Sequence, residues 1–261
     1  MPPAGFCKPL RVLLRSSRGA ARAFKNGAGM FSTDRDLLVH EPGLFDEVAW
    51  LTQTLFSGAS ASLDGNGTAA LISGINTATM GVVTGNVVRL EGLGPMEVTG
   101  VFGAEVLGVS KLRASVAEAP VPAGPPSWTG GASMTTFAPQ RKAAHTALLT
   151  RLGIAPGDPP ESWNEAAALA GAVPFYASQV VASRELADAE TLAALAIVWA
   201  GAAAHPGSAG GPSRSGAWDR AVWYRERARR ALDGLTARVE TGGDGSRQPI
   251  SAAGVRRLRR G

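Results

Sequence analysis

The sequence has few of the residues that build disulfides and metal sites. Among its 261 residues there is one cysteine, Cys7, which excludes an internal disulfide framework and any site with several cysteine ligands. There are three histidines, His40, His145 and His205, and each falls in or at the end of an expected helix. None has a second ligand at metal-binding spacing, so we expect neither a metal site nor a histidine base.

Sequence motifs of catalysis and cofactor binding are also missing. There is no G-x-S-x-G elbow, no Walker loop and no G-x-G-x-x-G between a strand and a helix. The stretch Asp64-x-Asn66-x-Thr68 begins like a calcium loop, but Ile75 stands where the loop needs a bidentate acid. The remaining carboxylates are scattered, with no evident acid/base pair. We therefore expect no catalytic residue, no cofactor and no metal, and a protein that is not an enzyme.

Long apolar runs are absent as well. The longest covers residues 192–204, shorter than the roughly 18 residues that cross a bilayer, so we expect no membrane partner. This segment is apolar on nearly every side of a helix and needs cover from several directions. Some of that cover can come from another subunit.

Charge is abundant but unevenly placed. Residues 1–29 hold six basic residues and no acid, residues 30–213 hold 8 basic and 16 acidic residues, and residues 214–261 hold 12 basic and 5 acidic residues. An acidic body between basic ends suits docking onto surfaces of opposite sign or onto nucleic acid. An ordinary solvated surface is the alternative interpretation.

The N-terminal half predicts helices followed by strands. We expect residues 1–29 to be a basic disordered arm, or an extension that comes from a mis-called start codon, with Met30 as the natural start. Shortly after Met30, Thr33-x-x-Asp36 forms a capping box that should begin a helix. Pro42 should start a second helix that runs to Ser57, so residues 30–58 form N-terminal helices. Glycine and short β-branched runs then predict a β-rich insertion of about five strands over residues 59–116. A Pro/Gly linker is expected over residues 117–133.

The C-terminal half predicts a helical bundle over residues 134–240 and a basic tail over 241–261. We expect helices from Pro139 to Leu152, from Trp163 to Ala170, from Ala189 to Ala204 after an Asp188 cap, and from Trp218 to about Val239. The predicted fold class is α+β and mainly α, a helical bundle with a small β-rich insertion that is barrel-like or sandwich-like.

Two groups of side chains are candidates for binding a partner. On the last expected helix, Trp223 lies away from the apolar line with Arg227 and Arg230 one and two turns on. It can make a cation–π contact within the subunit, bind a neighbouring subunit or portal, or meet nucleic acid. The second group is the cationic tail, which is either a solvated end or a clamp for acidic protein surfaces or phosphates: Arg256, Arg257, Arg259 and Arg260.

Several segments, taken in order, resemble the head–tail adaptor (connector, head-completion) proteins of tailed phages, prophages and gene-transfer agents. The segments are residues 33–45 (TDRDLLVHEPGLF), residues 136–140 (TFAPQ), the helix 189–204, and residues 223–225 (WYR) leading to residues 242–245 (GGDG).

The resemblance implies a helical virion protein that forms a ring, usually of twelve copies, beneath the portal. Such a ring joins the portal to a tail or stopper protein and continues the DNA channel, with non-specific contact to packaged dsDNA possible. Its place is the virion neck, and the host cytoplasm during assembly. The C-terminal segment, roughly Asp244 to Gly261, would reach into the portal.

The chain departs from the adaptor pattern in two ways. Glu240-Thr-Gly-Gly-Asp-Gly stands where members often have D-x-D-G-D-G, which puts an ion site near Asp244 in doubt, and the β insertion is large. Two other functions remain open. One is a host enzyme or small-ligand-binding domain with its site between the β module and the helices, and the other is a nucleic-acid-binding protein that uses its basic tail.

Overall fold

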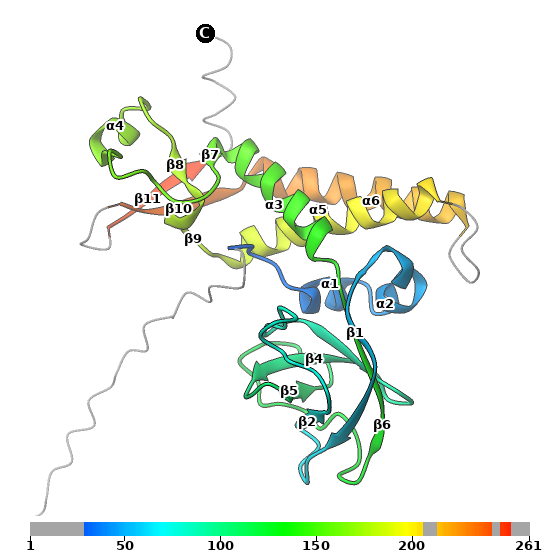
Figure 1. Ribbon diagram of the computed structural model, residues 1–261. Helices are drawn as coiled ribbons and strands as arrows, with labels where there is room; N and C mark the ends of the chain where they lie inside the picture. The colour runs from blue at the N-terminus through cyan, green and yellow to red at the C-terminus, as the bar shows by residue number, and fades with distance from the viewer. Residues whose placement is uncertain (1–28, 206–212, 242–245, 252–261) are drawn as a thin grey trace, which may run out of the picture.

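A β-barrel lies against one side of a layer of helices, as Figure 1 shows. The computed structural model describes residues 29–205, 213–241 and 246–251. Helices precede and follow the barrel in the sequence, so the barrel interrupts the helical part of the chain.

The barrel is closed and every neighbouring pair of its strands is antiparallel. The strand order is β1-β2-β5-β4-β3-β6, and β6 pairs with β1 to close it. Closure leaves no free strand edge, which removes the usual site of strand-to-strand aggregation. The strands are β1 (Gln53–Leu63), β2 (Ala69–Ile72), β3 (Val87–Leu90), β4 (Gly94–Val101), β5 (Val106–Ser110) and β6 (Thr129–Thr136).

Side chains fill the barrel and also attach it to the helices. Successive residues of a strand point to opposite faces, so Val88 and Leu90 pack inside the barrel, whereas Val87 packs into the core of the helical layer. Leu107 and Met134 are fully buried in the barrel interior. The interior is therefore a packed core.

The helical layer is built on two long helices that lie side by side, α5 (Arg184–Ala204) and α6 (Arg214–Asp233). Trp199 of α5 and Tyr224 of α6 are almost completely buried in its core. The other helices are α1 (Asp34–His40), α2 (Leu44–Glu47) and α3 (Ala138–Leu152), with a short 3-10 turn η1 (Ala49–Leu51) before the barrel.

Short elements complete one end of the layer. We call residues 153–183 the α4 lobe. It contains β7 (Ile154–Ala155) and β8 (Phe175–Tyr176), which pair in parallel, α4 (Glu165–Leu169), the turn η2 (Ala177–Gln179) and β9 (Val180–Val181). Strand β9 pairs with β10 (Thr236–Thr241), which pairs in turn with β11 (Ser246–Ser251).

The predicted fold class, a mainly-α bundle with a small β-rich insertion, is wrong. A complete six-stranded antiparallel barrel accounts for residues 53–136, and a second sheet of three strands lies near the C-terminus. The β content was underestimated because glycine-rich and proline-rich segments at both ends of the barrel look like helix ends and linkers when read alone.

Two segment boundaries are also corrected. The expected helix from Pro42 to Ser57 ends after α2 and η1, and β1 begins at Gln53, where pairing with β6 outweighs the helical spacing of Leu51 and Leu55. The expected linker 117–133 contains the start of β6. Its Gly130 and Gly131 are covered by the side chains of Trp128 and Glu91, so a larger residue there would clash.

The last two helices also differ from the prediction. Helix α5 begins at Arg184 with Ser183 as its N-cap, so Asp188 lies inside the helix. Helix α6 ends at Asp233, and the apolar residues Leu235 and Val239 belong to the loop and to β10. Both residues are buried, as expected, because alternate residues of a strand also face a core.

Several local predictions are confirmed. Thr33 and Asp36 form the capping box of α1, and Gly153 ends α3 in a left-handed conformation with φ of 71°. The turn Asp64 to Gly67 joins β1 to β2, and Gly67 has a positive φ of 67°. Short-range hydrogen bonds specify each of these features, so the local sequence suffices to predict them.

Helix α5 is also long and apolar enough, by length and composition alone, to cross a bilayer. Its most apolar window has a mean hydropathy of 1.4, but 67% of that window is buried inside the protein. Such burial is what a central core helix shows, and it agrees with the need for cover on several sides.

A buried carboxylate joins the barrel to the helices. Oδ1 of Asp34, which is fully buried at the start of α1, accepts hydrogen bonds from the backbone N–H of Phe137 and from Nε of Arg141, both at 3.1 Å. Its Oδ2 accepts from Nδ2 of Asn86, just before β3, at 2.9 Å. Arg141 also donates to the carbonyl of Ser32 at 2.6 Å. One side chain thus holds α1, α3 and the barrel together.

Substitution of Asp34 tests this junction. Asp34→Ala leaves the buried Arg141 guanidinium without its carboxylate, and we expect the free energy of unfolding to fall by about 3–5 kcal/mol. Asp36→Ala, two residues away, removes a partly exposed helix cap and should cost only about 1 kcal/mol. Denaturant unfolding measures both, and an equal loss in the two variants would contradict the role given to Asp34.

Candidate interaction surface

A second buried carboxylate, Glu190 of α5, holds the residues that precede α1. It accepts from the hydroxyl of Ser32 at 2.6 Å and from the backbone N–H groups of Ser32 and Phe31 at 3.0 and 3.2 Å. Nδ1 of His145 lies 2.7 Å from Oε2, the oxygen that also accepts from Phe31. Serine and histidine both contact the carboxylate, and no serine–histidine hydrogen bond occurs among the described residues. The cluster therefore anchors the chain and does not resemble an activated nucleophile.

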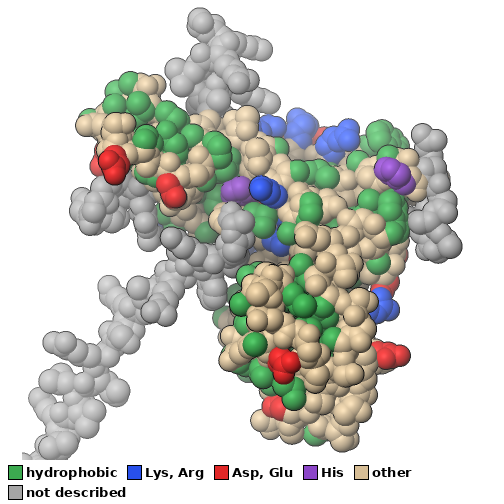
Figure 2. Space-filling view, viewed as in Figure 1, with side chains coloured by type: hydrophobic (Ala, Val, Ile, Leu, Met, Phe, Trp, Pro, Cys, Tyr) green, Lys and Arg blue, Asp and Glu red, His purple; other side chains and the backbone are tan. Residues whose placement is uncertain are grey.

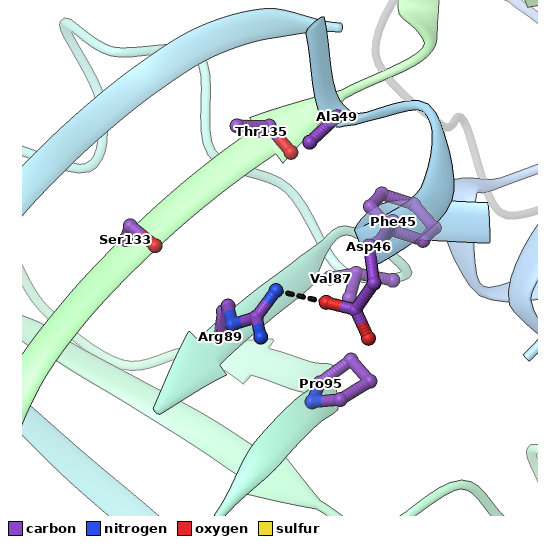
Figure 3. A pocket seen from close by; sticks show the side chains of 8 residues that line it. All are labelled: Phe45, Asp46, Ala49, Val87, Arg89, Pro95, Ser133 and Thr135. Atoms are coloured by element: carbon purple, nitrogen blue, oxygen red, sulfur yellow. Dashed lines mark hydrogen bonds and ion pairs between the residues drawn. The ribbon is translucent and has the colours of Figure 1, made fainter. Parts of the chain in front are cut away.

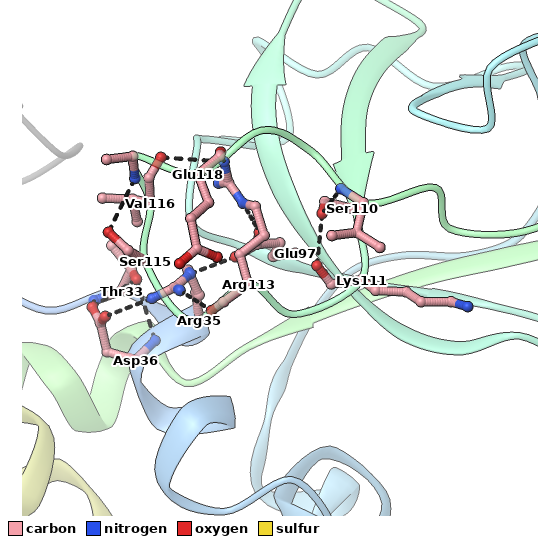
Figure 4. A network of polar contacts seen from close by, with 12 residues as sticks. Thr33, Arg35, Asp36, Glu97, Ser110, Lys111, Arg113, Ser115, Val116 and Glu118 are labelled. Carbon is pink, nitrogen blue, oxygen red and sulfur yellow. Dashed lines mark hydrogen bonds and ion pairs between the residues drawn. The ribbon is translucent and has the colours of Figure 1, made fainter.

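A third buried carboxylate, Glu97 of β4, lies between two arginines (Figure 4). Arg35 of α1 and Arg113 each form an ion pair with it, and Arg113 also donates to the carbonyls of Val116 and Glu118 at 3.2 and 2.6 Å. The network fastens the loop after β5 to α1. Its carboxylate and guanidinium groups are occupied by one another, which is the pattern of a structural ion-pair network.

A pocket lies where the alternative of a small-ligand site requires one, between α2 and the barrel (Figure 3). Its volume is about 150 Å³, and an ion pair between Arg89 and Asp46 spans it. Sites for small organic ligands usually occupy roughly 300–1,000 Å³, so this pocket is too small for such a ligand. Its lining consists of Phe45, Asp46, Ala49, Val87, Arg89, Pro95, Ser133 and Thr135.

Metal binding finds no support in the described part of the chain. No group of three or more His, Cys, Asp or Glu side chains lies close enough together there to hold an ion. His40 and His205 are apart from one another, and His145 is taken up by Glu190.

The outer face of α6 is the most distinctive exposed surface. We define it as the side chains of Trp218, Val222 and Arg225 on one flank of the solvent-facing side and of Trp223 and Arg227 on the other flank, with Asp219 and Glu226 between the two flanks. Trp218 is 50% exposed, Trp223 is 52% exposed, and Val222 lies between them on the helix with 45% exposed. Exposed tryptophans are unusual on a surface that stays in water and are frequent at the centre of protein interfaces.

Each of the two tryptophans has a guanidinium beside its ring. Cζ of Arg227 lies 4.5 Å from the centroid of Trp223, and Cζ of Arg225 lies 5.9 Å from the centroid of Trp218. A cation–π contact within the subunit, one of the three alternatives given for Trp223, is thus present. Neither Arg225 nor Arg227 forms an ion pair with a residue that the structure describes, so both remain available to an acidic partner.

Arg230, the third candidate on this helix, forms an ion pair within α6. Its Nε lies 3.1 Å from Glu226, one turn back on the same helix, and Arg229 binds the same carboxylate at 3.0 Å. The hydrogen bonds from Arg229, and next those from Arg230, lower the pKa of Glu226 to about 2. Arg230 is 73% exposed despite this pair, so it stays a candidate beside Arg227. The other candidates, Arg256, Arg257, Arg259 and Arg260, lie outside the described residues.

The flank of α6 that carries Arg227 lies beside the end of α1. The hydroxyl of the buried Tyr224 donates to Oε1 of Glu41 at 2.7 Å, and burial followed by this hydrogen bond raises the pKa of Tyr224. His40 is close enough to Arg227 for its charge to matter. Burial, and next the guanidinium of Arg227, lower the pKa of His40 below its ordinary value of 6.5.

Comparison with protein-family models, with curated proteins and with solved structures finds no match for this chain. Its own side chains are therefore the guide to its partners. Among the described residues, the buried polar clusters serve the fold and the pocket between α2 and the barrel is small, so the outer face of α6 is the best candidate for a functional surface. The sequence analysis identified Trp223 and Arg227 but missed Trp218 and Arg225. Each of the two missed residues lies one helical turn from Val222.

The titration of His40 is a direct test of the local geometry. Folded His40 resists protonation, so the protein loses stability as the pH falls below 6.5, and above that pH neutral His40 makes no contribution. We expect an NMR titration to place the His40 pKa below 6.5 and to show a rise in Arg227→Gln. A His40 pKa at or above 6.5 in the unsubstituted protein would show that Arg227 and burial do not act on it as described.

Stability measurements separate surface from core tryptophans. Trp223→Ala should lower the free energy of unfolding by less than about 1 kcal/mol, because half of its side chain is already in water. Trp199→Ala removes a fully buried side chain from the same helical layer and should cost about 3–5 kcal/mol. A comparable loss in both variants, measured by chemical denaturation, would mean that Trp223 has a structural role.

Proposed function

We propose that this chain is a structural virion protein, a subunit of the head–tail adaptor ring that joins the portal to the tail and continues the DNA channel. Its partners are then the portal protein, a tail or stopper protein, other copies of itself in a ring of about twelve, and packaged dsDNA through non-specific contacts. No membrane partner is proposed. The protein would act in the virion neck, and in the host cytoplasm during assembly.

The observation that carries the proposal is that the adaptor-like segments contact one another. Asp34, in the first segment, binds the backbone N–H of Phe137 in the second at 3.1 Å. Glu41, also in the first, binds Tyr224 in the last segment at 2.7 Å, and Glu190 in the third holds Ser32 beside the first. Segments separated by up to 183 residues thus form one packed unit. Such contacts are needed if these segments form a helical framework like that of the adaptor proteins.

The barrel fits the proposal as an addition to that framework. Residues 53–136 lie outside the adaptor-like segments except for Thr136, and they form a closed unit on one side of the helical layer (Figure 1). In a ring, the barrel would face outward or toward the tail. The outer face of α6 would remain for contact with portal or neighbouring subunits.

The test is assembly on the portal. The purified chain is mixed with the portal protein encoded beside its gene and examined by mass photometry and negative-stain electron microscopy. We expect multiple copies per portal ring, and we expect Arg227→Glu together with Trp223→Ala to weaken binding at least tenfold, because an interface depends on a few Trp and Arg side chains.

Lys142→Glu, on the exposed side of α3, changes the same charge away from α6 and should leave assembly intact. A wild-type chain that stays monomeric beside the portal, with no complex in either measurement, would refute the adaptor function.

A further inference from the structure

The pocket between α2 and the barrel has a floor of buried apolar side chains. Val87 of β3 and Phe45 of α2 both line it, and both belong to the core of the helical layer. The ring of Phe45 packs edge-on against the buried ring of Phe137, with their centroids 5.1 Å apart. Because core packing holds these side chains, the floor is formed before any ligand enters.

Charged side chains lie on the solvent side of the pocket. Arg89 of β3 and Asp46 of α2 line it and form an ion pair, and about half of each side chain is in water, 55% and 47% respectively. A charged ligand would be attracted by one member of the pair and repelled by the other. The two groups at the mouth therefore favour a neutral ligand.

Two hydroxyl groups face the pocket from β6. Ser133 and Thr135 occupy alternate positions of this strand, so both side chains lie on its outer face. Of the lining residues drawn in Figure 3, only Arg89 and Asp46 are joined by an interaction. The other lining groups thus leave both hydroxyls available to donate or accept a hydrogen bond.

The size of the pocket limits its ligand to one ring. A volume of about 150 Å³ is below that of most sites for organic ligands, but an apolar cavity of this size is large enough for a benzene ring. The apolar floor suits the ring, and the hydroxyls of β6 suit one polar substituent. A phenol has both parts and is neutral.

We propose that this pocket binds a phenol group, with the ring on Phe45 and Val87 and the phenolic hydroxyl at Ser133 and Thr135. The phenol can come from a tyrosine of a partner chain or from a free phenolic compound. The inference goes beyond the proposed function and does not depend on it, since phenol binding is measured without the portal.

Titration of the whole chain with phenol, followed by methyl NMR, tests the site. We expect saturable shifts of the methyl signals of Ala49 and Val87, which line the pocket. The methyl signals of Val109, buried inside the barrel, should not move. Absence of a saturable shift at Ala49 and Val87 would overturn the proposal.

Removal of the two hydroxyls tests the polar part of the site. Ser133→Ala with Thr135→Val should weaken phenol binding about fivefold, because a hydrogen bond typically contributes about 0.5–1.5 kcal/mol. The same double variant should not weaken the binding of toluene, which has the ring and no hydroxyl. Thr129→Val, on an exposed part of the same strand, is the matched control and should leave phenol binding unchanged. Unchanged phenol affinity in the double variant would contradict the assignment.

A filled pocket tests the location. Ala49 is exposed, so Ala49→Leu should fold normally while its larger side chain takes up part of the pocket, and the phenol-induced shift of Val87 should disappear. Denaturant unfolding checks the stability of this variant. A folded Ala49→Leu protein that still shows the saturable shift would place phenol elsewhere and overturn the proposal.

N-acetyl-tyrosinamide separates the two sources of the phenol group. Shifts of Ala49 and Val87 with this compound as well as with phenol would show that a tyrosine attached to a peptide chain can enter the pocket. Shifts with phenol alone would restrict the site to free phenolic compounds. Either result supports a phenol site, and neither bears on whether the chain assembles on the portal.

Discussion

The fold depends on the burial of the Asp34 carboxylate. This side chain is out of contact with water, and a carboxylate in that position requires several donors to remain charged. It finds them in three different parts of the chain, Asn86 before β3, the backbone of Phe137 and the guanidinium of Arg141. Because the donors come from the barrel and from α3, helix α1 can form its contacts only when both are in place.

Glu97 and Glu190 likewise connect distant parts of the chain. Glu97 brings together Arg35 of α1 and Arg113 after β5, and Glu190 of α5 holds the backbone of Phe31 and Ser32. All three carboxylates contact α1 or the residues just before it. The short helix, seven residues long, is therefore the piece on which barrel and helical layer are aligned. These carboxylates, which are scattered in the sequence, connect the barrel and the helical layer in the structure.

The sequence predicted what short-range interactions determine. The capping box at Thr33, the left-handed Gly153 and the buried line Ala221, Tyr224 and Ala228 follow from hydrogen bonds and spacings within a few residues. The barrel could not be predicted in full because strand β6 pairs with β1 over a separation of more than sixty residues. Gly130 and Gly131 indicate a linker until the side chains that cover them are seen.

The surface was predictable in part for the same reason. Trp223 and Arg227 are one turn apart, so their pairing followed from helical geometry, and so could that of Arg225 with Trp218. Arg230 also has a local partner, because it forms an ion pair with Glu226 one turn back on the same helix.

The paired ends of the barrel have an evolutionary consequence. Gln53 at the start of β1 lies opposite Thr136 at the end of β6, so the chain leaves the helical layer and returns to it at neighbouring points. A module whose two ends lie side by side can be inserted without separating the segments of the framework on either side of it. Arg35 of the framework depends on the module, because its carboxylate partner, Glu97, belongs to the barrel. A lineage without the barrel would have to replace this arginine as well.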